Sequence, residues 1–307
     1  MNSLLKKEDE IMPTLDKRRA VRAEQINIDG IVATRVTGLG DYSLSKTFDC
    51  GQCFRFEPSQ VVAGAFEGVA FGRFLRVYQD TPDDMTLLYV DIEEYENIWR
   101  GFFAIDRDWD AMREDIRSRC AELSDAADIA GDIRILTQER FEALVSFIIS
   151  QCNNIPRIKK LISALCERYG HPILTPEGKT VYTFPSADDI LARPLSDLTS
   201  LKLGYRDKYI YAAALAAKNG ILDEISAAES TREAERIVCS IEGVGKKVAS
   251  CVLLFGFARY DAFPVDVWMK RALARLFPDV NDYGVFGSYA GVAQQYMFYC
   301  ERYVNGK

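Results

Sequence analysis

The sequence changes from strand-like to helical patterns along its length, and this change limits the fold more than any other feature. Residues 25 to about 90 contain short runs rich in Val, Phe and Tyr, interrupted by Gly, as in VVAGAFEGVAFGRFLRVYQ. Such runs are typical of β-strands. From about Ile92 the apolar residues recur every three or four positions, which is the helical period. The pattern predicts an α+β protein with a β-rich domain at 25–130 and a helical domain at 131–307.

The helical half divides into separate segments that Pro, Gly and Asp punctuate. Each segment is long enough for one amphipathic or buried helix. No period of 20–50 residues repeats, so we do not expect a solenoid. The predicted helices cover residues 141–151, 156–170, 207–220, 231–241, 246–258, 265–277 and 289–304.

Charge and hydropathy narrow the classes of function. Residues 1–24 are charged throughout and lack the apolar stretch of a secretory signal, so we expect a polar tail and a protein that is cytoplasmic, not secreted, and nucleoid-associated in a bacterium. No run of 18 apolar residues occurs, so we expect no membrane span. The net charge is −7, but it is uneven: residues 131–307 carry 22 Lys and Arg against 20 Asp and Glu. This half can present a local basic face.

The cysteines and the histidine argue against several kinds of reaction centre. Only Cys50 and Cys53 form a C-x-x-C pair, and a metal site would need two more ligands. Without a signal peptide, reduced buried thiols are expected. The single histidine, His171, sits in a Gly-His-Pro turn, which argues against a Ser-His-Asp or Cys-His centre. We therefore predict no metal site.

The stretch IEGVGKKVASC, residues 241–251, is the most informative motif. It is not a P-loop, because Ser240 stands where G-x-x-x-x-G-K needs glycine. The flanking helical patterns instead predict a helix-hairpin-helix. Glycines in the hairpin let the backbone approach a phosphate, and free N–H groups at the start of the second helix can bind it. The predicted contacts to a DNA backbone are Gly243, Val244, Gly245 and Lys246.

The second lysine of the motif has a different surrounding. Lys247 is about 100° around the helix from Lys246 and shares a face with Cys251. Asp266 follows about 20 residues downstream, after Pro264, at the start of the next predicted helix. A helix cap is one explanation for this aspartate. A reactive pair is the other, because an amine can attack an electron-poor carbon while a carboxylate stabilises the positive charge that develops.

The segment GVGKK…FPVD resembles the helix-hairpin-helix DNA glycosylase superfamily. The motif G-V-G-x-K-V-A-x-C resembles that of its 8-oxoguanine DNA glycosylase/AP lyase branch. The resemblance implies an antiparallel sheet like that of the TATA-box-binding protein, followed by a helical glycosylase domain. It implies that Lys247 attacks C1′ of the damaged nucleotide and that Asp266 assists. It implies no required cofactor, although the hairpin carbonyls of the family can hold a structural monovalent cation.

Two further segments resemble the family's pocket for the flipped base. CGQCFRF matches the segment whose glycine, here Gly51, accepts a hydrogen bond from N7–H of the oxidised base. AGVAQQYMFY matches the segment whose glutamine pairs with the base and whose phenylalanine stacks on it; these are Gln294 and Phe298. The resemblance places Cys251 on the other side of the base.

Two more segments resemble the part of the family that contacts the opposite strand. SFIISQCNNIPRIKKL and LGYRDKYI supply an arginine that reads cytosine, an aromatic wedge and a second arginine. Cys152 stands where the family has the asparagine that fills the gap left by the flipped base, so Gln151 or Asn153 is an alternative gap filler. The predicted opposite-base and wedge residues are Cys152, Asn153, Arg157, Tyr205 and Arg206.

Together these matches predict a monomeric base-excision repair enzyme. Its expected substrate is duplex DNA that contains 8-oxoguanine, preferentially opposite cytosine, and its expected products follow from a Schiff base and β-elimination. Trp268 stands where relatives often have a histidine near the DNA backbone, and only Cys300 lies beyond Cys251, so no iron–sulfur cluster is expected. The alternatives are an alkylation-repair glycosylase, which generally lacks the hairpin lysine, and a DNA-binding module without chemistry.

Overall fold

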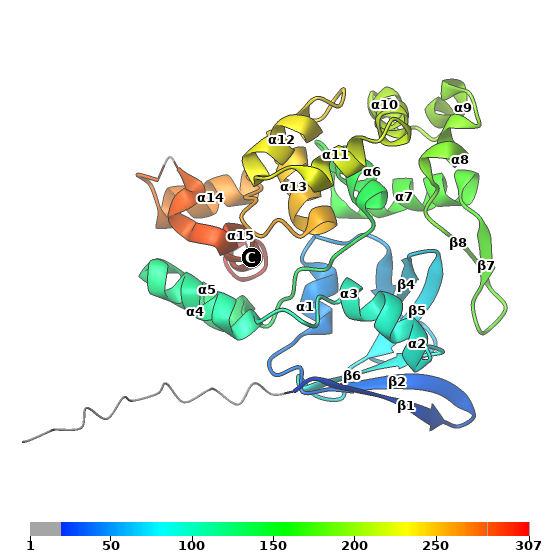
Figure 1. Cartoon of the computed structure of the whole chain (residues 1–307), viewed down its shortest axis with the longest axis horizontal. Helices are drawn as coiled ribbons and strands as arrows, with labels where there is room; N and C mark the ends of the chain where they lie inside the picture. Colours follow the sequence, from blue (N-terminus) through cyan, green and yellow to red (C-terminus); the bar gives the residue numbers. More distant parts are fainter. Residues whose placement is uncertain (1–19, 281, 307) are drawn as a thin grey trace, which may run out of the picture.

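The structure, a computed structural model, describes residues 20–280 and 282–306. An antiparallel sheet occupies one side of the molecule, and helices form the remainder (Figure 1). The predicted α+β class, with an antiparallel sheet followed by a helical domain, is therefore confirmed.

The sheet has the strand order β1-β2-β6-β5-β4-β3, and each neighbouring pair is antiparallel. Its first hairpin turns at Asp29–Gly30, where both residues have positive φ. Asp-Gly is favoured in such two-residue turns because glycine and aspartate tolerate this backbone. The strands are β1 (Arg22–Ile28), β2 (Ile31–Thr37), β3 (Phe56–Pro58), β4 (Phe66–Ala70), β5 (Arg73–Tyr78) and β6 (Asp84–Leu88).

An aromatic core joins the sheet to the short helices that cover it. Phe48 stacks on Phe56 with ring centroids 4.5 Å apart, and Phe56 stacks on Phe102 at 5.6 Å. Phe48 belongs to the helix that leads directly into the Cys50–Gly51 loop, so this packing fixes the start of that loop. The helical segments of this part are α1 (Leu44–Asp49), α2 (Ile92–Glu94), η1 (Tyr95–Trp99) and α3 (Arg100–Phe102).

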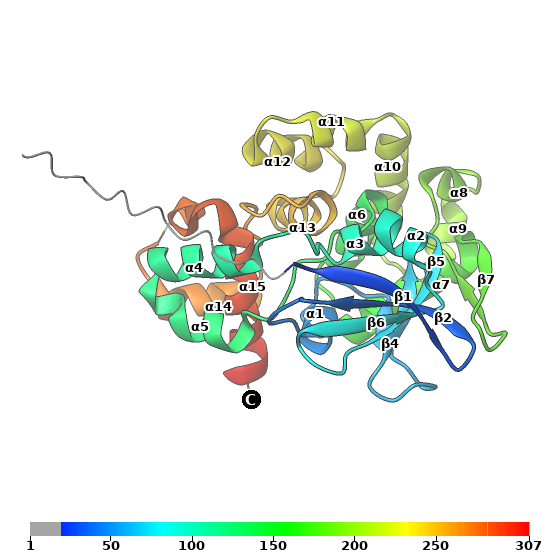
Figure 2. The ribbon, with the colours of Figure 1, turned by 60° about the horizontal axis from the view of Figure 1, so that its bottom comes forward.

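A second core fills the helical body, where α13 and α6 form the central pair. Figure 2 shows α13 between α12 on one side and α6 on the other. The segments are α4 (Trp109–Arg119), η2 (Ala121–Leu123), α5 (Ser124–Ala130), α6 (Arg140–Ser150), α7 (Ile155–Tyr169), β7 (Pro172–Leu174), β8 (Thr180–Tyr182), α8 (Ala187–Leu191), α9 (Leu195–Ser200), α10 (Arg206–Lys218), α11 (Ile221–Ala227), α12 (Thr231–Cys239), α13 (Lys246–Phe257), α14 (Val267–Leu276), η3 (Tyr283–Tyr289), α15 (Ala290–Tyr299) and η4 (Cys300–Val304).

The structure differs from the predicted boundaries in three places. Most of the predicted tail at 1–24 lies outside the described residues, but β1 begins at Arg22, because its backbone pairs with Thr37. The helices from Trp109 to Ala130 pack on α15 and η3, so they belong to the helical core rather than to the predicted β-rich domain. A small hairpin, β7–β8, interrupts the helical half, where the sequence predicted almost only helix.

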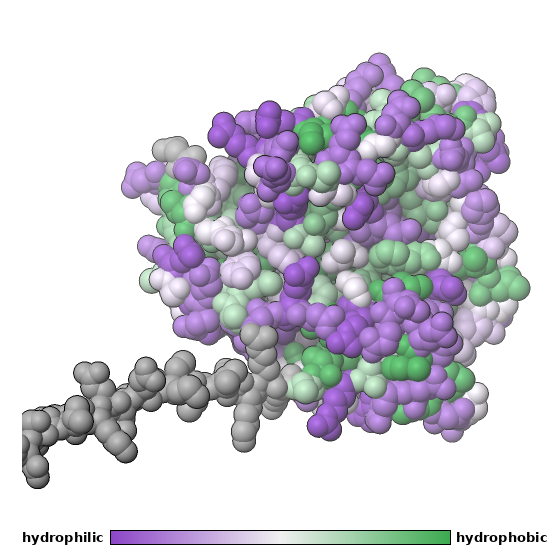
Figure 3. All heavy atoms as spheres, in the orientation of Figure 1, coloured by the Kyte–Doolittle hydropathy of each residue, from purple (hydrophilic) through white to green (hydrophobic). Residues whose placement is uncertain are grey.

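Polar and apolar side chains alternate on the face of the molecule that Figure 3 shows. On the face shown in Figure 3, apolar side chains lie in separate patches among hydrophilic ones. Within the described residues, no helix combines the length and the apolar character that a membrane crossing requires.

Candidate active site

The hairpin between α12 and α13 forms as the sequence predicted. Gly243 has φ +81°, and a Cβ placed there would overlap the Tyr209 ring, so this position requires glycine. Val244 is buried beneath the turn. Gly245 caps α13 without a side chain, and nothing lies within 4 Å of a Cβ built on it. The first N–H groups of α13 and the exposed Lys246 therefore face open space, as a phosphate site requires.

Lys247 lies one position further along α13 and turns inward. It is half-buried, and its Nζ lies 5.6 Å from the centroid of the Phe147 ring. Cys251, one turn later, is almost fully buried and also contacts Lys247. Burial raises the pKa of the Cys251 thiol, whereas the neighbouring Lys247 acts in the opposite direction. The thiol is thus a neutral, compact neighbour of the amine.

Asp266 is both a helix cap and a member of the cavity wall. Its carboxylate accepts a hydrogen bond from the backbone N–H of Met269 at 2.9 Å, which satisfies one free donor of α14. It also lines the cavity that Lys247 lines. The helix-cap and the reactive-pair explanations of Asp266 are therefore compatible, because the capping hydrogen bond holds the carboxylate in place.

The wall opposite α13 comes from α15. Gln294 is 4% exposed and lines the cavity, and its Oε1 is buried without a hydrogen-bond partner within the described residues. A buried polar atom without a partner is costly, so its position in a cavity wall indicates a ligand that donates a hydrogen bond. Phe298, one turn later, places its ring edge against Gly51.

These side chains enclose a cavity of about 60 Å³. The structure brings together all six residues that the sequence analysis assigned to catalysis and to the base pocket. The complete lining is Cys50, Gly51, Phe147, Lys247, Cys251, Phe255, Pro264, Asp266, Gln294, Gln295 and Phe298.

The predicted opposite-strand residues form a second group, around the end of α6. Cys152 is exposed and has φ +47°, a backbone conformation that few residues other than glycine adopt. Tyr205 is 45% exposed, and its hydroxyl lies near the Cys152 thiol. Arg157 is exposed near the start of α7. Asn153 donates to the Ile149 carbonyl at 3.1 Å and is therefore partly engaged by its own chain.

Arg206, which the sequence analysis assigned to the opposite base, is engaged by its own chain. It is only 4% exposed, and its guanidinium donates to the backbone carbonyls of Leu203 at 3.0 Å, Gln151 and Cys152. Arg206 therefore holds the loop that carries Cys152, whereas the Arg157 side chain is exposed. Contact of either arginine with cytosine stays a prediction.

Sequence reasoning missed several members of the cavity wall. Phe147 and Phe255 stack at 5.3 Å and form its floor, but each looks like an ordinary core residue of a buried helix. Gln295 is 2% exposed and bonds the Cys50 carbonyl. Two adjacent glutamines in an apolar helix were the only available signal for it.

Of the other residues that the sequence analysis mentioned, Cys50 lines the cavity, whereas Cys53, His171 and Trp268 do not. Cys50 and Cys53 are unpaired buried thiols, and burial raises the pKa of each to about 12. No group of His, Cys, Asp or Glu in the described part of the chain has the arrangement of a metal site. His171 is an exposed partner of Asp189 at 3.3 Å, and Trp268 stacks under Arg271 at 4.9 Å.

The fold and site define a class, that of helix-hairpin-helix base-excision DNA glycosylases. The model of the HhH-GPD superfamily of base excision DNA repair proteins matches residues 145–282, and that of the 8-oxoguanine DNA glycosylase N-terminal domain matches residues 37–144. The chain belongs to the 8-oxoguanine DNA glycosylase/AP lyase family, whose members are DNA N-glycosylases with AP lyase activity.

Individual relatives agree with this assignment. The 8-oxoguanine glycosylase/lyase of Clostridium acetobutylicum, solved with duplex DNA containing cytosine opposite 8-oxoguanine, has a TM-score of 0.84 and 34% identity over 92% of this chain and 98% of that one. A probable N-glycosylase/DNA lyase of Methanothermobacter thermautotrophicus is 28% identical over 85% of this chain and 93% of its own length. The N-glycosylase/DNA lyase of Saccharomyces cerevisiae is 35% identical over 47% of this chain and 41% of its own length.

Proposed function

We propose that this protein excises 8-oxoguanine from duplex DNA and then cleaves the strand, with Lys247 as the nucleophile. The observation that carries the proposal is a single cavity that holds a half-buried amine, a capped carboxylate and an unpartnered buried glutamine oxygen. An amine and a carboxylate supply the chemistry, and the glutamine supplies recognition of a flipped base.

Recognition uses the two edges of the flipped base. The Oε1 atom of Gln294 can accept from N1–H or the exocyclic amine of a guanine-type base, which satisfies its missing hydrogen bond. The Gly51 carbonyl accepts from N7–H, a donor that 8-oxoguanine has and guanine lacks. Phe298 stacks on one face of the base, and the neutral Cys251 thiol lies on the other.

The reaction then proceeds by substitution at the sugar. The lone pair of the Lys247 amine forms a bond to C1′ while the bond from C1′ to N9 breaks, and the base leaves with that electron pair and takes up a proton. The nitrogen loses a proton, and its lone pair then expels O4′ from C1′. O4′ takes up a proton, and a protonated Schiff base remains. Removal of a C2′ proton then expels the 3′ phosphate. Asp266 stabilises the positive charge that develops at the sugar and imine.

Preference for cytosine opposite the lesion is the finer part of the proposal. The exposed Arg157 can donate to O2 and N3 of cytosine, which are both acceptors. Tyr205 wedges into the stack beside the lesion, and Cys152 enters the gap. A panel of duplexes with 8-oxoguanine opposite each of the four bases measures this preference. Equal rates on all four duplexes would contradict it.

Borohydride trapping tests the nucleophile directly. Wild-type protein should yield a covalent adduct with an 8-oxoguanine duplex, and Lys247→Gln should yield none while it still binds the duplex. An alkylation-repair glycosylase without a lysine nucleophile, or a DNA-binding module, would give no adduct with the wild type. An adduct that persists in Lys247→Gln would assign the chemistry to another amine, and Lys246→Gln is the matched control.

The remaining features of the proposal concern the oligomeric state, the location and the cofactor requirement of the enzyme. We propose that it acts as a monomer on DNA in the cytoplasm and needs no redox cofactor or catalytic metal. We expect full activity after extensive dialysis against a chelator. We also expect a sedimentation coefficient that corresponds to a single chain. Loss of activity that a metal ion restores would contradict the proposal.

A further inference from the structure

The orientation of the Gly51 carbonyl decides whether the pocket can read N7–H, and several buried amides hold the backbone around it. Gly51 has φ +78°, a region that favours glycine, and a Cβ there would only touch Phe298 at 3.6 Å. Glycine is therefore required by the backbone conformation rather than by lack of space. Because glycine adopts many backbone conformations at similar cost, the contacts on either side of Gly51 decide where its carbonyl points.

A side chain of the helical body holds the Cys50–Gly51 peptide. Nε2 of Gln295 donates to the Cys50 carbonyl at 2.8 Å, and Gln295 is 2% exposed. The two residues are 245 positions apart in the sequence, so this hydrogen bond ties the recognition loop to α15. The neighbouring residue on α15 is Gln294, which faces the cavity.

The residue after Gly51, Gln52, is held by the segment that leads into α6. The fully buried Gln52 amide donates to the carbonyls of Thr47 and Arg134 at 3.0 and 2.7 Å, and its oxygen accepts from the Leu136 N–H at 2.8 Å. Gln138 donates to the Gln52 carbonyl at 2.6 Å. Gly51 thus lies between two anchored peptides.

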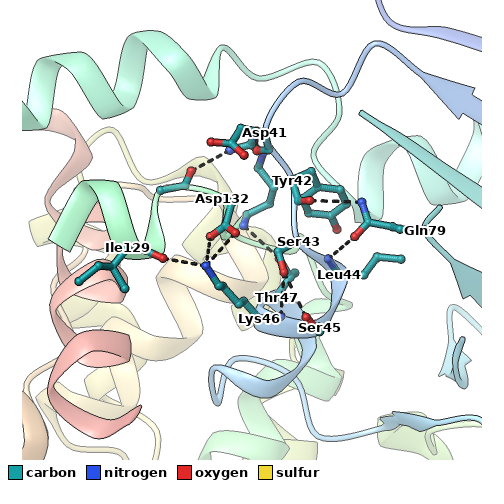
Figure 4. A network of polar contacts seen from close by, with 12 residues as sticks. Asp41, Tyr42, Ser43, Leu44, Ser45, Lys46, Thr47, Gln79, Ile129 and Asp132 are labelled. Carbon is teal, nitrogen blue, oxygen red and sulfur yellow. Dashed lines mark hydrogen bonds and ion pairs between the residues drawn. The ribbon is translucent and has the colours of Figure 1, made fainter. Parts of the chain in front are cut away.

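The helix before the loop is anchored as well, as Figure 4 shows. Ser43 caps α1, and Lys46 donates to the Ile129 carbonyl at 2.7 Å and pairs with Asp132 at 2.8 Å. Gln79 accepts from the Leu44 N–H at 2.7 Å. These contacts fix the start of α1, whereas Gln295 fixes the point where the chain enters the pocket.

We propose that Gln295 is a positioning residue for recognition of the oxidised base. It sets the Cys50–Gly51 peptide so that the Gly51 carbonyl meets N7–H, while Gln294 on the same helix meets the Watson–Crick edge. Adjacent residues of a helix point about 100° apart, so one helix governs both edges of the base. The inference rests on the proposed function, because it assumes that Gly51 reads N7–H.

The proposal separates two activities. Excision of 8-oxoguanine needs the aligned carbonyl, because a rotated one loses the hydrogen bond to N7–H. Cleavage at a preformed abasic site involves no base recognition. It needs only Lys247 and the contacts that bind the DNA backbone. Loss of the Gln295 amide should therefore lower the first activity and spare the second.

The main test compares Gln295→Met with wild type in single-turnover assays on 8-oxoguanine and abasic duplexes. Methionine has similar volume but no donor. We expect excision to fall ~10-fold, since one lost hydrogen bond of ~1.4 kcal/mol is a factor of ten, while abasic cleavage stays within about 2-fold. The matched control is Gln79→Met, which also loses an amide that bonds the backbone but lies away from the pocket. Its ratio of the two activities should equal that of the wild type.

A second variant gives a readout that mere destabilisation would not produce. Gln295→Glu donates to the Cys50 carbonyl only while its carboxyl group is protonated, and burial favours that neutral form. Its ratio of excision to abasic cleavage, relative to wild type at the same pH, should fall as the pH rises from 5 to 8. A ratio that does not change in either Gln295 variant would overturn the inference. A wild-type protein that fails to excise 8-oxoguanine would instead refute the proposed function.

Discussion

At the scale of single residues, Asp266 combines a structural and a chemical task, and one substitution separates them. Asparagine caps helices about as well as aspartate, so Asp266→Asn should keep the hydrogen bond to the Met269 N–H. We expect the free energy of unfolding in urea to change by less than about 0.5 kcal/mol. The single-turnover excision rate should fall roughly 100-fold or more, because the carboxylate charge is gone.

Asp266→Ala is the companion variant for this prediction. It should lose both the charge and the cap, which costs ~1 kcal/mol of stability. If Asp266→Asn keeps the wild-type rate, the carboxylate is only a cap.

Cys152 offers a test of backbone strain. The left-handed conformation at this position is disfavoured for cysteine but tolerated by asparagine. We expect Cys152→Asn to raise the free energy of unfolding by about 0.5–1 kcal/mol, as measured by urea denaturation. Cys239→Asn, in the helical conformation of α12, is the control and should bring no gain. A gain at both positions would show that strain is not the cause.

The sequence predicted the site residues that belong to a motif. It could not predict roles that depend only on contacts in the folded protein. Lys247, Asp266 and Gln294 belong to spaced motifs, and the structure places all three in one cavity. Arg206 also belongs to a motif, but its buried bonds to backbone carbonyls depend on a loop 55 positions away. Gln295 depends in the same way on a distant partner.

At the scale of elements, the hairpin predicts different outcomes for its two glycines. Gly243→Ala introduces a methyl group into the Tyr209 ring at positive φ, so it should cost at least about 2 kcal/mol of stability. Gly245→Ala meets open space at φ −97° and should cost at most about 1 kcal/mol. Its effect should appear in binding to an abasic-analogue duplex, because the methyl group blocks close approach of a phosphate.

Urea denaturation and binding at two salt concentrations measure these effects. The affinity of Gly245→Ala should depend less steeply on salt than that of wild type, as expected when a phosphate contact is lost. Unchanged affinity and salt dependence would place the phosphates elsewhere.

The sequence predicted the bounds of some helices and strands better than those of others. Long helices such as α7 and α13 carry a clear period and lie within a few residues of their predicted bounds. The hairpin β7–β8 has only three residues in each strand, too few for a period to show. Tertiary contacts with the sheet and with α7 determine it instead.

At the scale of the whole molecule, a buried ion pair joins the two parts of the fold. Arg55 follows the recognition loop, and it pairs with Glu142 of α6 at 3.3 Å. Burial raises the pKa of the Glu142 carboxyl to about 7, although Arg55 acts to lower it. The native state therefore binds a proton that the unfolded chain releases near pH 4.5, so this group stabilises the fold less as the pH rises from 4.5 to 7.

Glu142→Gln removes this titration. The free energy of unfolding of the variant, relative to wild type, should rise by ~2 kcal/mol between pH 5 and pH 8, as measured by denaturation at each pH. Any cost of the substitution that does not depend on pH shifts all values equally, so the slope is the readout. A difference that stays constant over this range would contradict the raised pKa.

The domain boundary shows what sequence alone could not give at this scale. Patterns located the change from strand to helix, but they could not show that α4 and α5 pack on α15. A helix carries the same period whichever core it covers, so only the packed chain assigns α4 and α5 to the helical body.

The bond between Cys50 and Gln295 also bears on synthesis in the cell. The two residues are 245 positions apart, so the ribosome must translate most of the chain before the loop can meet its helix. A nascent chain that has reached only α14 already carries the hairpin and its amine, but it lacks both glutamines. The recognition loop therefore gains its hydrogen bond to the helical body only after α15 has emerged from the ribosome.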